Sequence, residues 1–404
     1  MTLKIAFRNI FRQKRRTLLT MLTMFGGFVL SAFSVGMSDG TYNRIIDMFT
    51  RNRLGHIQIH KEDYLDRPAL YKTIDNYRAI GRSIQSVSGV TSWTPRVYSA
   101  GLASVGDKAT GVRIIGIDPQ KEQAATRFDR KIVEGKAFSD TAAHETILGR
   151  GLANILRAKL GDELVIVSQG ADGSIANDLY IVTGILESGD NISDQTALYL
   201  HIDDAQELLV LEGRVHELVI IGKSLDDVPE LTDRIAETLA DPSLAVESWQ
   251  EFAKSFYRAM KADQEGGWIM LIIIIGIAAV GVLNTVLMTV LERRREYGVL
   301  RAIGMRPGQI FHLVISEVAV MAVFSIIFAF GVSLLVNYLF SHTGFPTATA
   351  FTYGGIEFSR MYTEINARSF YMPGVAIFLS ALIVSIFPAL RAAHIEPARA
   401  MRIH

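Results

Sequence analysis

The sequence predicts an α-helical membrane protein with four transmembrane helices and one α+β domain inserted on the extracytoplasmic side. Two observations support this prediction. Hydrophobic residues make up 49% of the 404 residues, and they concentrate in four long runs that carry almost no charge. The interval after the first run, residues 39–265, is far too long for a connector and has the composition of a folded domain.

The four runs have the length that a membrane-spanning helix needs. No charged residue lies between Arg16 and Asp39, and as a helix this stretch rises about 33 Å, close to a hydrocarbon core of about 30 Å. A cleaved signal peptide is the alternative for this run, but its apolar part exceeds the usual 7–15 residues. The predicted transmembrane helices are residues 17–38, 266–291, 317–340 and 372–390.

Basic residues flank these helices on one side of the membrane. They occur in the amphipathic N-terminal segment 1–16, in the loop 292–316 and in the tail 391–404. Because lysine and arginine accumulate in cytoplasmic segments, we expect both termini and the loop in the cytoplasm. The domain 39–265, with a stalk at each end, and the loop 341–371 are then periplasmic.

The inserted domain shows alternating strand and helix patterns. Residues 55–61 predict a strand, 74–87 a helix and 97–118 two strands around a turn. Residues 145–169 predict strand, helix and strand. Strands at 178–188, 196–202 and 216–223 follow, with helices at 203–210, 228–240 and 248–267. The mixture is typical of an α+β domain.

The sequence contains no recognisable constellation for catalysis. The motifs HExxH, GxSxG and GxxxxGK[ST] are absent, and so is cysteine. His56 and His60 share a face of a predicted strand, but they lie about 13 Å apart, too far to share one metal. The net charge is zero, so no global field attracts nucleic acid. We therefore expect no catalytic residue, metal or cofactor in this chain.

Small and polar residues within the spans are candidates for helix packing. The pairs Gly27/Ser31 and Ala32/Gly36 are four residues apart, a spacing that lets helices approach closely, although glycine is also generally tolerated in membrane helices. Asn284 is a candidate for a hydrogen bond across helices. Glu317 begins the third span, and an arginine of the 293–306 segment is its expected partner, with a proton relay as the alternative.

The segment between the second and third spans, ERRREYGVLRAIG (residues 292–304), predicts a short helix. Val299, Leu300 and Ile303 form a small apolar face, Gly304 offers a left-handed end, and Pro307 follows. A loop that only sets topology is the alternative. Such a loop needs neither the apolar face nor the defined end, so this helix indicates a partner protein.

Five segments carry a resemblance to a known family. The segment 292–304 resembles the cytoplasmic loop of FtsX/MacB-type ABC transporter permeases, and Glu317 matches an acidic residue at the start of their third span. AFRNIFRQKRRTLLT (6–20) and PALRAAHIEPARAMR (388–402) resemble the two ends of these proteins. GHIQI (55–59) and LGRGLANILRAKLGDEL (148–164) are similar to their MacB-like periplasmic core domain.

The resemblance implies a type VII, mechanotransmission permease of the bacterial inner membrane. It implies a dimer with a second copy or a paralogue, membrane lipid around the spans, and a separate ABC ATPase subunit that binds ATP and Mg. The coupling helix that docks this ATPase would comprise Glu296, Gly298, Leu300, Arg301, Ala302, Ile303 and Gly304.

Within the family, the chain looks most like the lipoprotein-releasing, LolC/LolE-like branch, which passes lipoproteins to a periplasmic carrier. A tripartite efflux pump for hydrophobic compounds, with a membrane-fusion protein, is the first alternative. An FtsX-like regulator of a cell-wall hydrolase is the second, although its outer domain is usually smaller. A membrane-anchored enzyme is disfavoured because the sequence shows no catalytic constellation.

Overall fold

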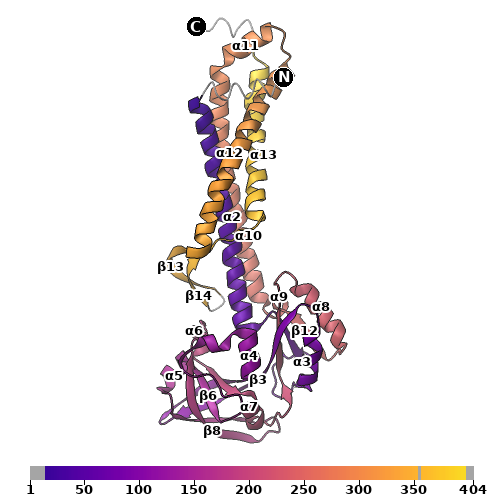
Figure 1. Ribbon diagram of the computed structural model, residues 1–404, viewed down its shortest axis with the longest axis vertical. Coiled ribbons are helices and arrows are strands. Elements are labelled where there is room, and N and C mark those ends of the chain that lie inside the picture. Colours follow the sequence, from indigo (N-terminus) through magenta and orange to yellow (C-terminus); the bar gives the residue numbers. More distant parts are fainter. Residues whose placement is uncertain (1–13, 354–355, 397–404) are drawn as a thin grey trace. The chain divides into compact units, whose positions relative to one another are not determined.

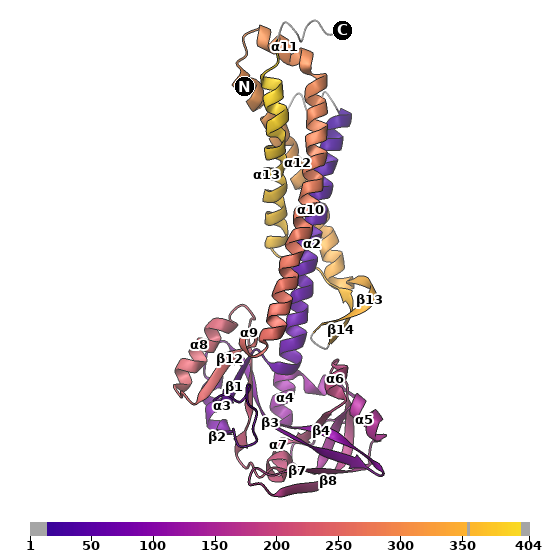
Figure 2. The ribbon, with the colours of Figure 1, turned by 180° about the vertical axis from the view of Figure 1, so that it is seen from behind.

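The computed structural model describes residues 14–353 and 356–396. The chain divides into two compact units (Figures 1 and 2). The helical unit contains residues 14–44, 260–348 and 360–396, and the head contains residues 45–259, 349–353 and 356–359. The predicted N-terminal helix 1–16 lies mostly outside the described residues, and the tail 391–404 lies partly outside them.

Four long helices form the helical unit. They are α2 (Lys14–Phe49), α10 (Lys254–Glu292), α12 (Pro307–Thr343) and α13 (Arg368–Ala393). Each contains one of the four predicted spans and is long and apolar enough to cross a membrane. They pack through small and β-branched side chains such as Ala278, Val282, Ala322 and Ile377, which are at most 5% exposed. The short helix α11 (Arg294–Ala302) lies across one end of the bundle (Figure 1).

The segment predicted as a loop, 341–371, contains regular structure that the sequence analysis missed. Strands β13 (Phe345–Tyr353) and β14 (Ile356–Met361) pair in a two-stranded sheet. The chain then packs against α2, where the Glu364 N–H donates to the Gly36 carbonyl oxygen at 2.8 Å. The tip of this hairpin belongs to the head and its base to the helical unit.

The head is built on a ten-stranded sheet with the order β12-β1-β11-β3-β4-β9-β6-β8-β5, and β7 pairs with both β3 and β8. Its strands are β1 (Ile57–Lys61), β3 (Val90–Val105), β4 (Lys108–Ile117), β5 (Ile132–Gly135), β6 (Glu145–Gly149), β7 (Glu163–Gln169), β8 (Ile175–Leu186), β9 (Ala197–His201), β11 (Glu217–Gly222) and β12 (Leu244–Ser248). Strands β2 (Ile74–Asp75) and β10 (Arg214–Val215) form a separate pair.

The longest strand, β3, takes part in two substructures. Its first half pairs with β11 and its second half with β7, while β4 runs antiparallel along it from Arg96 to Val105. Because β7 also pairs with β8, strands β3-β4-β9-β6-β8-β7 close into a ring. Side chains from the strands of this ring form a hydrophobic core, which includes the fully buried Ile114, Leu164, Ile166 and Tyr180.

Helices surround the sheet of the head. They are α3 (Tyr77–Gln85), α4 (Pro119–Thr126), α5 (Arg150–Leu156), α6 (Asn191–Asp194), α7 (Ile202–Leu208), α8 (Val228–Leu239) and α9 (Trp249–Phe252). The elements β2, β5, β10, β12, α4 and α6 were not predicted, and β2 occupies the first two residues of the predicted helix 74–87. The predicted helix 248–267 is in fact two helices, because the backbone leaves the helical region at Ala253, where α9 ends before α10 begins.

An aromatic cluster joins the parts of α2 and α10 that belong to the head. The rings of Phe49 and Phe256 stack with centroids 3.7 Å apart and planes at 9°. Trp249 and Tyr353 meet Phe256 edge to face at 6.5 and 5.5 Å. The two predicted stalks therefore contact each other through large apolar surfaces, with β13 against them.

Candidate functional site

The candidate site is α11 and the side chains that hold it to α10 and α12. The helix follows α10 after a break at Arg293, and Gly304 follows its end with φ +100°. Two backbone bonds, from Gly304 N–H to Arg301 O and from Met305 N–H to Leu300 O, close the end as a Schellman motif. The left-handed end predicted at Gly304 is therefore confirmed.

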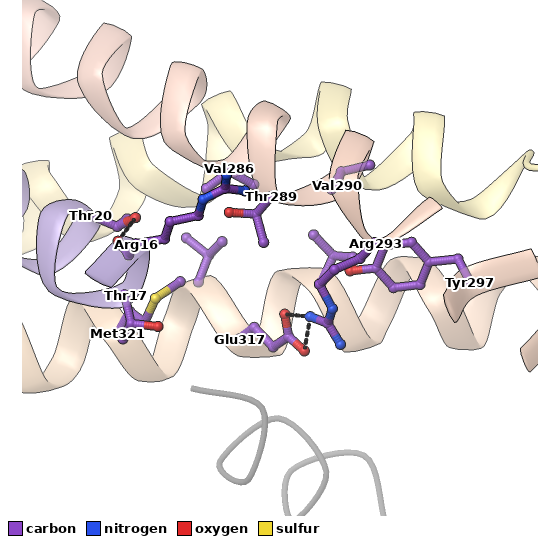
Figure 3. Close-up of a pocket in the computed structure, with 12 residues that line it drawn as sticks. Arg16, Thr17, Thr20, Val286, Thr289, Val290, Arg293, Tyr297, Glu317 and Met321 are labelled. Atoms are coloured by element: carbon purple, nitrogen blue, oxygen red, sulfur yellow. Dashed lines mark hydrogen bonds and ion pairs between the residues drawn. The ribbon is translucent and has the colours of Figure 1, made fainter. Parts of the chain in front are cut away.

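A buried ion pair fixes the start of α11 against α12. Arg293 Nη1 donates to both oxygens of Glu317 at 3.0 and 2.9 Å (Figure 3), and Arg293 Nε donates to Glu296 at 3.0 Å. The Arg293 and Glu317 residues are only 7% and 8% exposed. The expected partner of Glu317, an arginine of the 293–306 segment, is thus confirmed. With both carboxylate oxygens bonded to arginine, the geometry favours the structural role over a proton relay.

Tyr297 completes this arrangement, which we call the Arg293 cluster: Arg293, Glu296, Tyr297 and Glu317. The Tyr297 ring is fully buried, and the Arg293 guanidinium lies 5.2 Å from its centroid. A small cavity of about 30 Å³ lies beside the cluster and is lined also by α2, through Arg16, Thr17 and Thr20 (Figure 3). Arg16 forms an ion pair with Glu292 at the end of α10. Three long helices therefore converge on the base of α11.

The outer side of α11 is exposed and apolar. Val299 is 42% exposed and Ile303 is 77% exposed, whereas Leu300 is half-buried and packs on the bundle core. The predicted apolar face of these three residues is therefore divided. Leu300 faces inward because Arg293 ends α10 and sets the rotation of the next helix. Only Val299 and Ile303 remain for a partner.

The other predicted coupling residues lie around this helix. Gly298 is buried beside Tyr297, Glu296 and Arg301 are half-buried, and Ala302 and Gly304 are exposed. Helix α11 ends at Ala302, so the last two predicted members belong to its C-terminal turn.

The small residues of α2 lie at helix contacts. A Cβ at Gly27 would come within 2.7 Å of Ala278 Cβ, and one at Gly36 within 2.4 Å of Asn337 Oδ1. Ser31 and Ala32 are fully buried. Close packing is thus their role. Asn284 is different: it is exposed on α10 and makes no hydrogen bond to another helix among the described residues, so the bond predicted for it is absent from this chain's own bundle.

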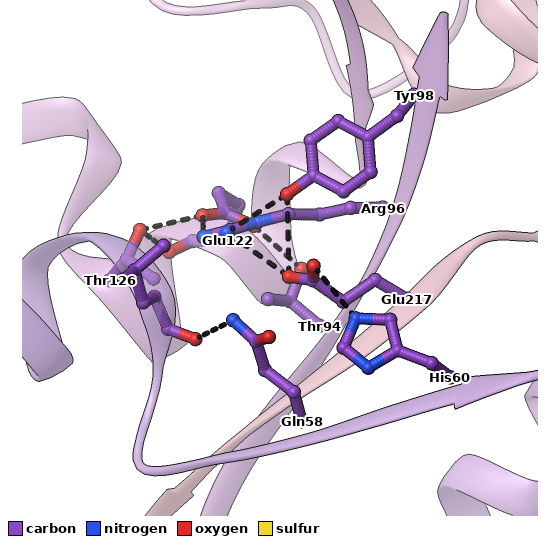
Figure 4. Close-up of polar contacts among 9 residues, drawn as sticks. Gln58, His60, Thr94, Arg96, Tyr98, Glu122, Thr126 and Glu217 are labelled. Atoms are coloured by element: carbon purple, nitrogen blue, oxygen red, sulfur yellow. Dashed lines mark hydrogen bonds and ion pairs between the residues drawn. The ribbon is translucent and has the colours of Figure 1, made fainter. Parts of the chain in front are cut away.

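A second polar cluster, the Arg96 cluster, lies inside the head and was missed by the sequence analysis. It comprises Thr94, Arg96 and Tyr98 of β3, Glu122 and Thr126 of α4, Glu217 of β11 and His60 of β1 (Figure 4). Arg96 donates to Glu122 Oε1 at 2.6 Å and to Glu217 Oε1 at 3.5 Å. The signal in the sequence is the run of polar side chains at 94, 96 and 98, which resembles a solvent-facing strand surface.

The charges of the Arg96 cluster compensate each other. Arg96, Glu122 and Glu217 are at most 6% exposed. Burial alone would raise the pKa of Glu122, but the adjacent guanidinium and the Thr126 hydroxyl hold it below its usual value. The cluster therefore keeps Glu122 charged, and its hydrogen bonds bind three strands to α4. We assign it a structural role within the head.

The MacB-like periplasmic core domain matches residues 17–238, more than half of the chain, and the FtsX-like permease C-terminal domain matches residues 268–397. The chain belongs to the FtsX/MacB-type ABC transporter permeases. The fold is accordingly that of a four-helix membrane permease with an inserted MacB-like periplasmic core domain.

Relatives of this permease carry several names. The lipoprotein-releasing system transmembrane protein LolC of Neisseria meningitidis is 25% identical over 271 residues, which cover 65% of this chain and 64% of that protein. An uncharacterized ABC transporter permease of Methanocaldococcus jannaschii is 23% identical and aligns over 98% of this chain and 96% of its own. The macrolide export ATP-binding/permease protein MacB of Bartonella henselae is 22% identical over 77% of this chain and 47% of that protein. The permease thus spans just under two thirds of the LolC relative and about half of the MacB relative.

Proposed function

We propose that this permease transmits ATP-driven motion from a separate ATPase subunit to its head, and that this motion releases lipoproteins from the membrane. The observation that carries the proposal is the two-sided construction of α11. Its inner side is anchored to α10 and α12 by the Arg293–Glu317 pair and Tyr297. Its outer side presents Val299 and Ile303 to a partner. A push on the exposed side would reach α10 through a rigid contact.

The proposed topology places α11 and both termini in the cytoplasm and the head in the periplasm. The basic flanks support this orientation. Because the chain has no cysteine, single cysteines introduced at Arg306 and Ile192 report sidedness directly. A membrane-impermeant maleimide added to intact spheroplasts should label position 192 and not position 306. Labelling of both positions from outside would place residues 192 and 306 on the same side of the membrane and would contradict the proposed topology.

The docking role of α11 is tested by adding a charge to its exposed apolar side. We expect Ile303→Glu to weaken recovery of the ATPase with the purified permease by about 30-fold, since burying an unpaired charge at an interface hot spot costs about 2 kcal/mol. Ile192→Glu is the matched control, because Ile192 in the head has the same exposure of 77%. Equal recovery with the two variants would refute docking at α11.

Release of lipoproteins is supported by the name of the LolC relative. The experiment is to deplete the permease in its host and follow acylated proteins by membrane fractionation. We expect lipoproteins to accumulate in the inner membrane. The MacB relative supports export of a hydrophobic compound as a second candidate. Normal lipoprotein sorting together with increased sensitivity to a macrolide would favour that candidate over the first.

A further inference from the structure

A second cavity in the helical unit lies outside the Arg293 cluster. It has a volume of about 280 Å³, compared with about 30 Å³ for the cavity beside Glu317. The end of α10 and the start of α11 contribute Val290, Leu291 and Arg294, and the end of α13 contributes Arg391, His394, Ile395 and Glu396. This volume exceeds what one ordered water needs and admits a polar group of several atoms.

The polar side of this cavity is basic. Arg294 and Arg391 are exposed, and neither forms an ion pair with another residue in the described ranges 14–353 and 356–396. The ring of His394 donates from Nδ1 to the Leu390 carbonyl oxygen at 2.9 Å, which leaves Nε2 available. Glu396 is the acidic member of the lining and has interactions of its own. Two permanent positive charges therefore line the cavity together with one carboxylate, and neither arginine is paired with an acid among the described residues.

The cavity also lies at a defined depth along its helices. The charge-free run of α10 ends at Leu291, and the charge-free run of α13 ends at Leu390, directly before Arg391. In a membrane-spanning helix this boundary is where the hydrocarbon ends and the lipid phosphates begin. Val290, Leu291 and Ile395 line the cavity together with the arginines. Its lining thus combines apolar and basic groups at phosphate depth.

We propose that this cavity binds the phosphate group of an anionic phospholipid. Basic pockets between membrane helices are suited to such headgroups, because the arginine fork donates to two phosphate oxygens. Arg391 is also favoured in the last turn of α13 by the helix dipole. The helix dipole accounts for Arg391 on α13 alone. It does not account for a cavity that is lined by arginines from two different helices. The proposal is independent of what the permease transports.

Native mass spectrometry of the full-length chain tests the proposal. The purified protein is stripped of lipid and returned to equal amounts of phosphatidylglycerol and phosphatidylcholine. The wild type should retain phosphatidylglycerol preferentially. Arg294→Gln/Arg391→Gln should lower its affinity about 30-fold, at about fivefold for each basic residue. Lys14→Gln/Arg15→Gln removes two exposed charges near the same end of the helical unit and should keep the preference.

Other outcomes would overturn the proposal. Equal retention of both lipids by the wild type, or unchanged phosphatidylglycerol binding in the double variant, would contradict it. The variant Arg391→Lys keeps the positive charge, so it must bind phosphatidylglycerol more tightly than Arg391→Gln does. An equal loss of phosphatidylglycerol affinity in both variants would show that the charge at position 391 does not bind the lipid. Displacement of phosphatidylglycerol by inorganic phosphate alone would assign the site to free phosphate. Loss of the lipid when the ATPase binds, with a cross-link from a cysteine at position 394, would assign the cavity to the protein partner.

Discussion

Removing the carboxylate of Glu317 should loosen α11 while leaving the bundle assembled. Arg293 would lose both of its bonds to Glu317, at 3.0 and 2.9 Å, and would keep only Glu296, whose side chain is 38% exposed. Breaking a buried pair from one side costs about 3–5 kcal/mol. Because Glu296 still compensates part of the charge, we expect the lower end of this range for Glu317→Leu, about 3 kcal/mol. This corresponds to an increase of roughly 150-fold in the open population of α11.

A single cysteine at the half-buried Leu300 provides the assay. The chain has no cysteine of its own, so the rate of maleimide labelling in detergent reports how often α11 separates from the bundle. Glu317→Leu should raise this rate strongly, and Glu237→Leu, on the exposed surface of the head, should not. The double variant Arg293→Met/Glu317→Leu should restore slow labelling, because an apolar pair leaves no buried charge. Equal rates in the wild type and Glu317→Leu would refute the anchoring role.

Three further predictions concern packing and charge. Gly27→Ala should destabilise the bundle by about 1–3 kcal/mol, because the new Cβ would lie 2.7 Å from a side chain of α10, whereas Gly26→Ala meets nothing within 4 Å and should leave the thermal stability unchanged. Burial lowers the pKa of His216 from 6.5 to about 4. The unfolded chain then binds more protons than the folded chain below pH 6.5, so the free energy of unfolding should fall by about 3 kcal/mol between pH 6.5 and 4. Denaturation measured across this pH range tests the prediction, because His216→Gln should make the free energy of unfolding depend less on pH. Glu122→Gln should cost about 3 kcal/mol, because the only carboxylate then left to compensate the Arg96 charge in this cluster is Glu217, at 3.5 Å, and hydrogen exchange in β3 should increase accordingly.

The four apolar helices and the main contact of the candidate site could be read from the sequence. A run without charge has few alternatives to a spanning helix, so all four spans fall within helices. The arginine partner of Glu317 could be predicted because a carboxylate beside an apolar run needs a compensating charge, and the basic segment 293–306 is the nearest source of one. Gly304 was recognisable because few other residues adopt positive φ at a helix end.

The features that were missed depend on contacts between distant segments. The Arg96 cluster joins residues 26 and 121 positions apart from Arg96, and alternation along β3 cannot distinguish a solvent-facing surface from one covered by α4. The inward direction of Leu300 depends on the break at Arg293, a residue whose side chain pairs with Glu317 of α12, 24 positions away. The hairpin of β13 and β14 lies between two spans, where the sequence suggested only a connection.

Helix α10 runs without interruption for 39 residues, about 58 Å, and the backbone leaves helical geometry just outside each of its ends, at Ala253 and Arg293. A straight, uninterrupted helix of this length passes on displacement along its axis, and at Arg293 the buried pair to Glu317 holds its end to α12. For the transmission that we propose, this geometry favours displacement of α10 along its axis over rotation about it.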